Sequence, residues 1–160
     1  MKELLFALLA IYMILIGAIG IAIAFKKRKI NKKIKELANN TLEMTPEEFK
    51  KMRNTSFGGR GRKLHALTQN FSGVYILYNK TKNMYYVGQG VQVLNRVNSH
   101  FTGKGNGDVY ADYKYGDEFT IRMIALENSG FQTLNELERN TISHYNAFSN
   151  GYNKTRGNRG

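Results

Sequence analysis

Apolar residues form one long uncharged run at the start of the chain. From Leu4 to Phe25 no residue is charged and nearly every position is apolar. As a helix rising about 1.5 Å per residue, this run would measure about 33 Å, against about 30 Å for a bilayer hydrocarbon core. It therefore predicts a transmembrane anchor over residues 1–25. A cleaved signal peptide is the main alternative, but its apolar core would be only about 7–15 residues long. A buried core helix fits poorly, because so small a domain could hardly surround it.

The next segment mixes apolar and basic positions and predicts a basic, partly helical linker over residues 26–70. Residues 30–37 have the mixed pattern of an amphipathic helix lying on the bilayer surface. A second helix is predicted from Thr45, where a capping threonine precedes Pro46 and two acids. The glycine-rich segment 58–62 ends it.

From residue 71 onward the apolar positions alternate as in strands or recur as in helices. Residues 73–78 and 84–88 alternate around a polar turn and predict a β-hairpin. Residues 119–124 predict a third strand. Helical spacing predicts a helix over about 91–101 and another from the capping pattern at Thr133 to about Phe148, with residues 103–108 as a loop. The expected fold of residues 71–160 is α/β, a small three-stranded antiparallel sheet flanked by helices.

Basic residues are concentrated close to the apolar run. The net charge is +12, and residues 1–70 contain 14 Lys/Arg against 5 Asp/Glu. Seven basic residues occur between Lys26 and Lys35, whereas only Lys2 precedes the run, so the positive-inside rule places the remainder of the chain in the cytoplasm. We interpret Lys26–Lys35 as a topology signal that also attracts anionic lipid headgroups. Basic residues of the later loops could contact nucleic acid or simply be solvated: Arg60, Arg62, Lys63 and Lys104.

An ordered series of polar and aromatic residues lies within the predicted α/β unit. Gly73-Val74-Tyr75 is followed by Tyr86-Val87-Gly88, and Gly151-Tyr152-Asn153 closes the series. Between them, Arg96 and His100 are four residues apart on the first helix, and Glu138 lies on the second. Order, spacing and predicted elements resemble the GIY-YIG nuclease family over residues 73–153, with Val74 and Val87 replacing isoleucine.

The resemblance implies an active site made of six residues: Tyr75, Tyr86, Arg96, His100, Glu138 and Asn153. It implies that Glu138 binds a divalent cation, Mg²⁺ or Mn²⁺, and that Tyr75 is the general base. Mg²⁺ prefers oxygen ligands and keeps several waters, so one carboxylate and a substrate phosphate suffice. Arg96 can bind a phosphate through two N–H donors. His100 could relay or accept the proton, and Tyr86 and Asn153 would position other groups.

Each of these residues alone has an ordinary structural explanation. A strand tyrosine usually packs in a core, and an isolated helical arginine or histidine is usually solvated. Glu138 is less ordinary, because it borders the apolar face of its helix, where an acid is costly without a partner. Glu136 already has a capping position, so the metal is assigned to Glu138.

The sequence therefore predicts a single-pass membrane protein that presents a DNA endonuclease domain to the cytoplasm. Its tether suggests a role against incoming phage or plasmid DNA, or in DNA uptake. A membrane-attached nucleic-acid-binding or interaction module with the same fold but no catalysis is the alternative. A nuclease secreted after signal cleavage is a third possibility.

Overall fold

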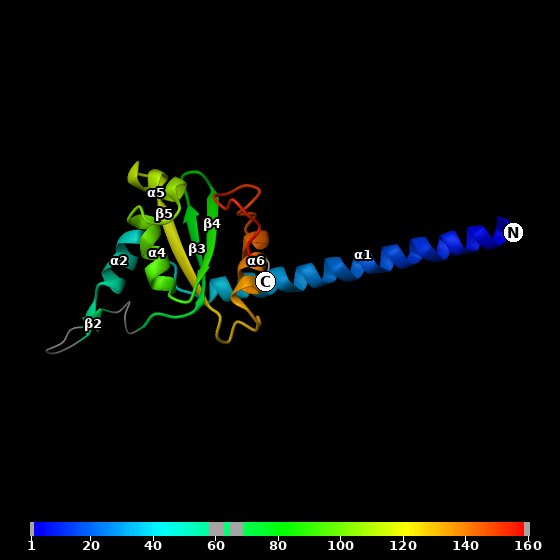
Figure 1. Ribbon diagram of the computed structural model, residues 1–160, viewed down its shortest axis with the longest axis horizontal. Coiled ribbons are helices and arrows are strands. Elements are labelled where there is room, and N and C mark those ends of the chain that lie inside the picture. Colours follow the sequence, from blue (N-terminus) through cyan, green and yellow to red (C-terminus); the bar gives the residue numbers. More distant parts are fainter. Residues whose placement is uncertain (1, 58–62, 65–68, 159–160) are drawn as a thin grey trace.

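The computed structural model describes residues 2–57, 63–64 and 69–158 as one long helix leading into a compact α/β unit (Figure 1). The helices and strands follow in this order: α1 (Lys2–Asn39), α2 (Pro46–Arg53), β1 (Ser56–Phe57), β2 (Lys63–Leu64), β3 (Gly73–Asn79), β4 (Met84–Gly90), α4 (Val93–Phe101), α5 (Gly107–Lys114), β5 (Phe119–Ala125) and α6 (Leu134–His144).

The central sheet confirms the predicted architecture. Its strand order is β4–β3–β5, and both pairings are antiparallel. The β3–β4 hairpin turns through Asn83, a residue with a positive φ of 53° that asparagine tolerates better than most residues. Because β3 is paired on both sides and covered on both faces, Val74 to Leu77 are all buried. Alternation along β3 then divides these side chains between two cores.

Helices cover both faces of the sheet (Figure 1). Tyr75 and Leu77 point to the face covered by α2, α4 and α5, where Leu94, Val97 and Phe49 complete the core. The opposite face is covered by α6 and by the last turns of α1. Its core contains these residues: Val74, Ile76, Val87, Ile124, Leu137, Ile142, Ile34 and Ala38.

The C-terminal part of α1 packs against the sheet rather than lying on a bilayer surface, as the sequence had suggested. Ile34 and Ala38 are almost completely buried, and Ile30 packs beside them. These residues are four apart and so share one helix face, and the apolar sheet face accommodates that stripe. Lys33 extends the contact by donating a hydrogen bond from Nζ to the Gly130 carbonyl oxygen over 2.8 Å. With no Gly or Pro between residues 21 and 39, nothing interrupts the helix.

Residues 44–49 also belong to the folded unit. The backbone of Met44 exchanges two hydrogen bonds with Ile121, which extends the sheet beyond the outer edge of β5. The predicted cap at Thr45 is present and forms a full capping box: Glu48 N donates to Thr45 Oγ1 over 3.2 Å, and Thr45 N donates to Glu48 Oε2 over 2.8 Å. This cap directs α2 so that Phe49 is buried against the sheet.

Three details differ from the sequence prediction. The chain forms a helix, α5, where no element was expected, and the side chain of Asn106 caps it by accepting hydrogen bonds from the backbone N–H groups of Asp108 and Val109. Helix α6 ends at His144, before Phe148, and Asn146 follows with a positive φ. The short β1–β2 pair was also unexpected.

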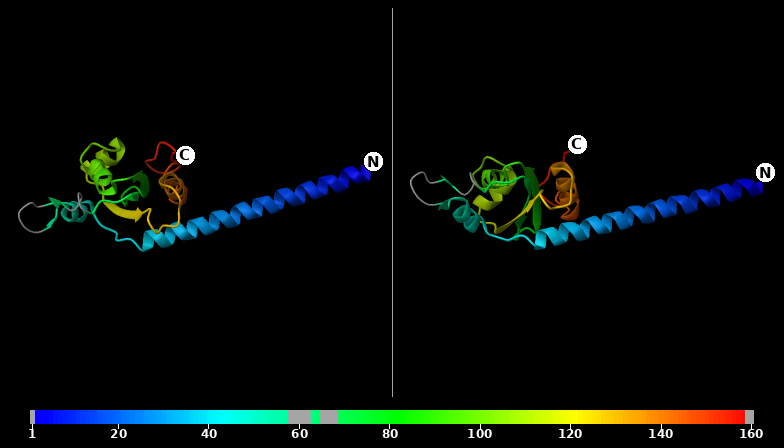
Figure 2. Two further views of the ribbon diagram at one scale, coloured as in Figure 1. Left: turned by 60° about the horizontal axis from the view of Figure 1, so that its bottom comes forward. Right: turned by 90° about the horizontal axis from the view of Figure 1, so that it is seen from below.

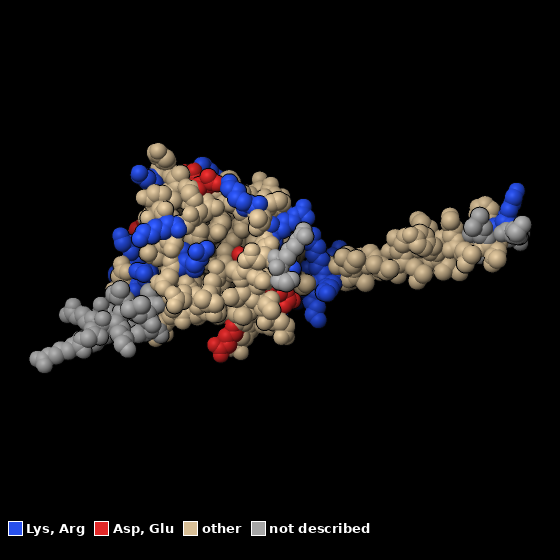
Figure 3. Space-filling model, in the orientation of Figure 1, with Lys and Arg blue, Asp and Glu red and all other residues tan. Residues whose placement is uncertain are grey.

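The first part of α1 extends well away from the α/β unit (Figure 2). Among the described residues it supplies one candidate membrane span, Leu8–Asn39, whose most apolar stretch has a mean hydropathy of 2.7 and is not buried within the molecule. Lys and Arg side chains gather where this helix meets the α/β unit (Figure 3), at Lys26–Lys29. A long apolar helix followed by a basic flank is a pattern typical of membrane-spanning helices, and the basic flank here lies on the side of the folded unit.

The packing of α1 predicts that Ile34→Ala destabilises the α/β unit. The Ile34 side chain is fully buried, so its truncation should lower the free energy of unfolding by about 2–5 kcal/mol. The measurement is denaturant unfolding of the full chain in detergent micelles.

The matched control is Ile21→Ala, because Ile21 lies on the same helix and is 59% exposed. It should leave the free energy of unfolding of the α/β unit unchanged. Equal stability of Ile34→Ala and wild type would contradict the packing.

Candidate active site

Tyr75 and Gly88 face each other across the β3–β4 pairing. A Cβ atom at position 88 would collide with the hydroxyl end of the Tyr75 ring. Since glycine has no Cβ, the ring can lie flat over β4 and carry its hydroxyl group toward α4. The glycine of the second tripeptide is therefore required by the tyrosine of the first.

The Tyr75 hydroxyl meets His100 of α4. Tyr75 Oη and His100 Nε2 are 2.9 Å apart, and both side chains are buried. On the other side of the imidazole, the backbone N–H of Asn106 donates to Nδ1 over 2.9 Å. Nδ1 is thus the acceptor, so a neutral ring carries its proton on Nε2 and donates it to Tyr75 Oη.

A lone histidine at this helix position would usually be solvated, whereas His100 is buried because the loop after α4 folds over the ring. A Cβ at Gly105 would lie 2.7 Å from His100 Nδ1, so only glycine lets the backbone approach this closely. The predicted glycine-rich loop therefore has a local structural task, which is to bury the histidine and fix its tautomer.

Burial sets the ionisation of this pair. Desolvation, assisted by the charge of Arg96, lowers the pKa of His100 to about 4, so the imidazole is neutral near pH 7. Desolvation, and next the neighbouring Tyr86, raises the pKa of Tyr75 above its ordinary value, while Arg96 opposes the change. Tyr75 is therefore protonated at neutral pH, with a hydrogen bond ready to stabilise the phenolate if the proton leaves.

Arg96 projects from α4 as an exposed side chain. Its stem passes over β4 at Gly90, where an added Cβ would lie 2.7 Å from Arg96 Cγ. Among the described residues, no carboxylate is within ion-pair distance of its guanidinium. Desolvation raises the pKa values of Tyr75 and Glu138, and the charge of Arg96 opposes this rise at both groups. The guanidinium is thus close to both groups and free to bind an anion.

Tyr86 lies beside Tyr75 and His100. Its ring centroid is 6.2 Å from that of Tyr75 and 4.7 Å from that of His100. Desolvation raises the pKa of Tyr86, whereas Arg96 lowers it. The half-buried phenol therefore stays neutral and can act as a hydrogen-bond donor at the edge of the site.

Glu138 brings a carboxylate to this cluster from α6. It is only 8% exposed, and its Oε2 accepts hydrogen bonds from Gln89 Nε2 over 3.1 Å and from the Asn158 backbone over 3.3 Å. Desolvation raises the pKa of Glu138 even though these bonds and Arg96 oppose the change. The sequence expectation that this acid needs a partner fits the two donors found.

Asn153 fixes the edge of the sheet instead of pointing into the cluster. Its side-chain Nδ2 donates to the Val87 carbonyl oxygen over 2.7 Å, and the Val87 N–H donates to its Oδ1 over 2.9 Å. The amide thereby pairs with both outward backbone groups of Val87 on the free edge of β4. This contact positions the strand that carries Tyr86 and Gly88.

The structure brings in residues that the sequence reasoning missed. Gln89 bridges Glu138 to Asn135, donating to Asn135 Oδ1 over 2.6 Å. Asn106 and Asn158 contribute backbone N–H groups. Gln89 could have been noticed as a polar residue directly after the second tripeptide, but backbone donors from loops leave no signal in sequence.

The predicted nucleic-acid contacts are only partly described. Lys104 is exposed in the loop that covers His100. Arg60 and Arg62 lie outside the described residues, and for Lys63 the backbone alone is described. Within the described residues no group of three or more His, Cys, Asp or Glu side chains could bind a metal ion. A metal here would depend on one carboxylate.

The profile of the GIY-YIG catalytic domain matches residues 71–153. The chain belongs to the GIY-YIG family. This match covers the sheet, α4, α5 and α6, and it indicates a nuclease, a hydrolase of nucleic acid. No significant match was found among curated proteins or among solved structures.

The buried histidine of this GIY-YIG domain predicts a loss of stability in acid. Below its ordinary pKa of 6.5, His100 gains a proton in the unfolded chain but not in the folded one until about pH 4. The free energy of unfolding should therefore fall as the pH drops through this window, by up to about 3 kcal/mol. Denaturant unfolding at about pH 7.5 and about pH 4.5 measures the fall.

His100→Gln is the comparison, because glutamine does not titrate. The variant should lose less stability than wild type between the two pH values, although it is less stable at neutral pH. An identical pH dependence in both proteins would show that His100 accepts a proton in the folded state.

Proposed function

We propose that the protein is a membrane-anchored endonuclease that hydrolyses DNA phosphodiester bonds with the help of a divalent cation. The observation that carries the proposal is the position of Arg96. Its guanidinium has no carboxylate within ion-pair distance in the described part of the chain, and it is close enough for its charge to act on Tyr75, Tyr86, His100 and Glu138. A phosphate bound by Arg96 would therefore lie among a neutral phenol pair, a neutral imidazole and a carboxylate.

Arg96 suits the binding of the scissile phosphate. A guanidinium stays charged at any working pH and can donate two parallel hydrogen bonds to phosphate oxygens. As charge develops on these oxygens in the transition state, a fixed cation stabilises it. The half-buried hydroxyl of Tyr86 can add a hydrogen bond to the same group.

Tyr75 is the proposed base, and His100 supports it. The neutral imidazole donates from Nε2 to Tyr75 Oη and has its other nitrogen occupied by Asn106. It is therefore arranged to stabilise a phenolate, and Nε2 has no lone pair to accept the tyrosine proton. The raised pKa of Tyr75 means that additional positive charge is needed before the phenol loses its proton to solvent and becomes the phenolate, which is the form that can take a proton from the attacking water.

The residues fit a divalent cation. Glu138 is a desolvated carboxylate whose Oε2 is oriented by two donors, and oxygen is the ligand type that Mg²⁺ and Mn²⁺ prefer. When bound, such a cation would supply positive charge that stabilises the phosphate oxygens and lowers the pKa of nearby acids. Glu138 would hold such a cation, and Arg96 is close enough for its charge to act on the same carboxylate.

The proposal predicts Mg²⁺-dependent cleavage of plasmid DNA by the full chain in detergent micelles. Arg96→Ala and Glu138→Ala should each slow cleavage at least about 100-fold, because each removes charge stabilisation at phosphorus. Tyr75→Phe, which keeps the ring but removes the base, should slow it by about 100-fold to 10,000-fold. Single-turnover cleavage rates provide the measurement.

Glu136→Ala is the matched control, since Glu136 is an acid of the same helix whose carboxylate accepts a hydrogen bond from Gln132. It should cleave at the wild-type rate. Folded wild type that retains DNA but never cleaves it would instead support the binding-module alternative.

The apolar part of α1 and the basic residues that follow it support a cytoplasmic, membrane-tethered domain. The described residues form no separate domain that could read a DNA sequence. Cutting should therefore tolerate many DNA sequences and depend on contacts with phosphates. Confinement at the membrane would direct such an enzyme to DNA that enters the cell. We propose incoming phage or plasmid DNA as its target.

The proposed role predicts that protection depends on location. Replacing residues 2–25 by a soluble fusion partner should preserve cleavage in vitro, because the buried part of α1 is retained. In cells the same change should reduce protection against phage or plasmid entry. Plaque and transformation counts measure this, with the Glu138→Ala chain as the inactive reference; unchanged protection by the soluble form would contradict the role.

A further inference from the structure

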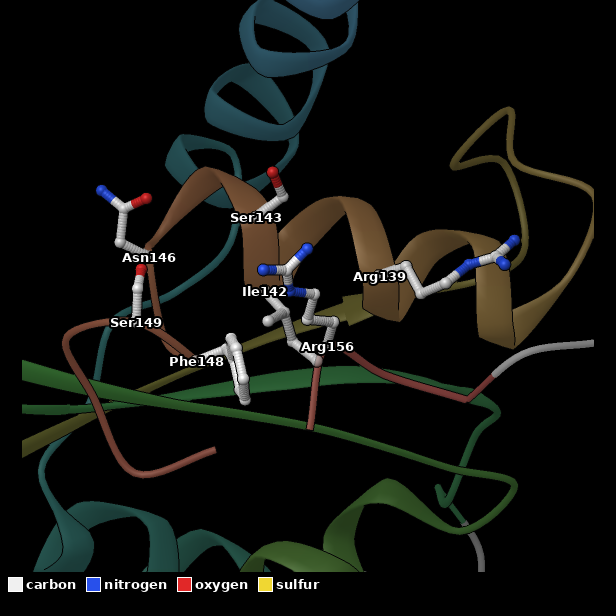
Figure 4. A pocket seen from close by; sticks show the side chains of 7 residues that line it. All are labelled: Arg139, Ile142, Ser143, Asn146, Phe148, Ser149 and Arg156. Atoms are coloured by element: carbon white, nitrogen blue, oxygen red, sulfur yellow. The ribbon is translucent and has the colours of Figure 1, made fainter. Parts of the chain in front are cut away.

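A hollow of about 240 Å³ lies on the outer side of α6 and the segment that follows it. Its lining combines basic, hydroxyl, amide and aromatic groups: Arg139, Ile142, Ser143, Asn146, Phe148, Ser149 and Arg156 (Figure 4). Within the described residues, none of these side chains is hydrogen-bonded to Tyr75 or to His100. The proposed cleavage of DNA does not involve the residues that line this hollow.

Arg156 is arranged for an anion. Its guanidinium lies over the Phe148 ring, 5.4 Å from the ring centroid, and Figure 4 shows it directed toward Ile142 and Ser143 of α6. Contact with an aromatic face orients a guanidinium while leaving its in-plane N–H donors free. Within the described part of the chain, neither Arg156 nor Arg139 has a carboxylate in ion-pair distance.

The hollow adjoins Glu138 through two connections. Arg139 is the next residue of α6. The second connection is Gly157, which follows Arg156 in the chain. A Cβ at Gly157 would lie 2.8 Å from Arg139 Cγ and 3.4 Å from Glu138 Oε2. The segment that carries Arg156 therefore touches both the carboxylate and Arg139.

We propose that this hollow binds a backbone phosphate of the DNA strand that flanks the scissile phosphate, with Arg156 as the main contact and Arg139 as the cation between the two positions. The proposal rests on the nuclease function above. Arg139 follows Glu138 in α6 and lies against the segment of Gly157, so a strand that runs from Glu138 toward Arg156 would meet Arg139 on its way. Ser143, Ser149 and Asn146 offer further hydrogen bonds without reading bases.

A lipid phosphate is the competing anion, and the position of the hollow favours DNA. A different hollow of about 370 Å³ adjoins the end of the apolar run and is lined by Ile23, Lys26, Lys27, Ile30 and Asn31 of α1 together with Asn140 and Ser143 of α6. Of these residues, Ser143 alone also lines the Arg156 hollow. The Arg156 hollow instead adjoins the segment hydrogen-bonded to Glu138. A second fixed phosphate would set the direction in which the strand crosses the site.

Binding of a short DNA duplex to the full chain in micelles, measured with a chelator present over a range of salt concentrations, tests the inference without cleavage. Arg156→Ala should weaken binding about tenfold and reduce the slope of log K against log salt by about 0.9. Phe148→Leu should weaken binding but keep the slope, because the cation remains and only its orientation is lost.

Lys114→Ala, an exposed basic residue of α5, is the matched control for loss of one charge and should leave both quantities near wild type. An unchanged slope in Arg156→Ala overturns the inference. So does loss of a co-purified anionic lipid in Arg156→Ala, detected by mass spectrometry, with DNA binding intact.

Cleavage separates this inference from the function on which it rests. With Mg²⁺ present, Arg156→Ala should raise KM while kcat stays near wild type, because the contact is made equally in ground and transition states. A wild-type protein that binds DNA with the expected salt dependence but does not cleave would overturn the nuclease and leave the phosphate site supported.

Discussion

The arrangement of the site depends on one cross-strand pair, in which a glycine lies opposite a tyrosine. Gly88 leaves room for the Tyr75 ring to cross β4 and reach His100. Any side chain at position 88 would displace the ring, and the imidazole would lose its partner. Because a strand register shifted by one residue reverses every side chain, the same pair also fixes which core receives Tyr75. Sheet register and site geometry are thus one constraint.

The sequence predicted the sheet better than it predicted the surroundings of the proposed site residues. The strands were recognisable as short apolar runs bounded by turn residues, and β3 is apolar from Val74 to Leu77 because it is buried on both faces. Glu138 was recognisable as an acid beside an apolar helix stripe. The burial of His100 was not recognisable, because it depends on the loop at Gly105 folding back. Helix α5 was missed since only Val109 is buried along it, which leaves no clear periodicity.

The role of α1 shows a different limit. A stripe of apolar residues four apart is equally suitable for a bilayer surface and for the face of a sheet. Ile34 and Ala38 complete the core on the sheet face that α6 only partly covers, and α1 contacts β5 and α6 there. The periodicity of a sequence shows that one face of a helix is apolar. Whether that face packs on a sheet or on a bilayer depends on the rest of the fold.

The continuity of α1 from its apolar run into the core has a mechanical consequence. Only about 7 Å of helix separates Phe25 from Ile30, and no flexible segment intervenes. An enzyme on a long flexible linker explores a wide volume around its attachment point, whereas a stiff connection restricts both height and orientation. If α1 spans a bilayer as proposed, the catalytic face is carried at one distance and one angle above the surface. The enzyme would then cut only DNA that passes the membrane surface at the distance at which the catalytic face is held.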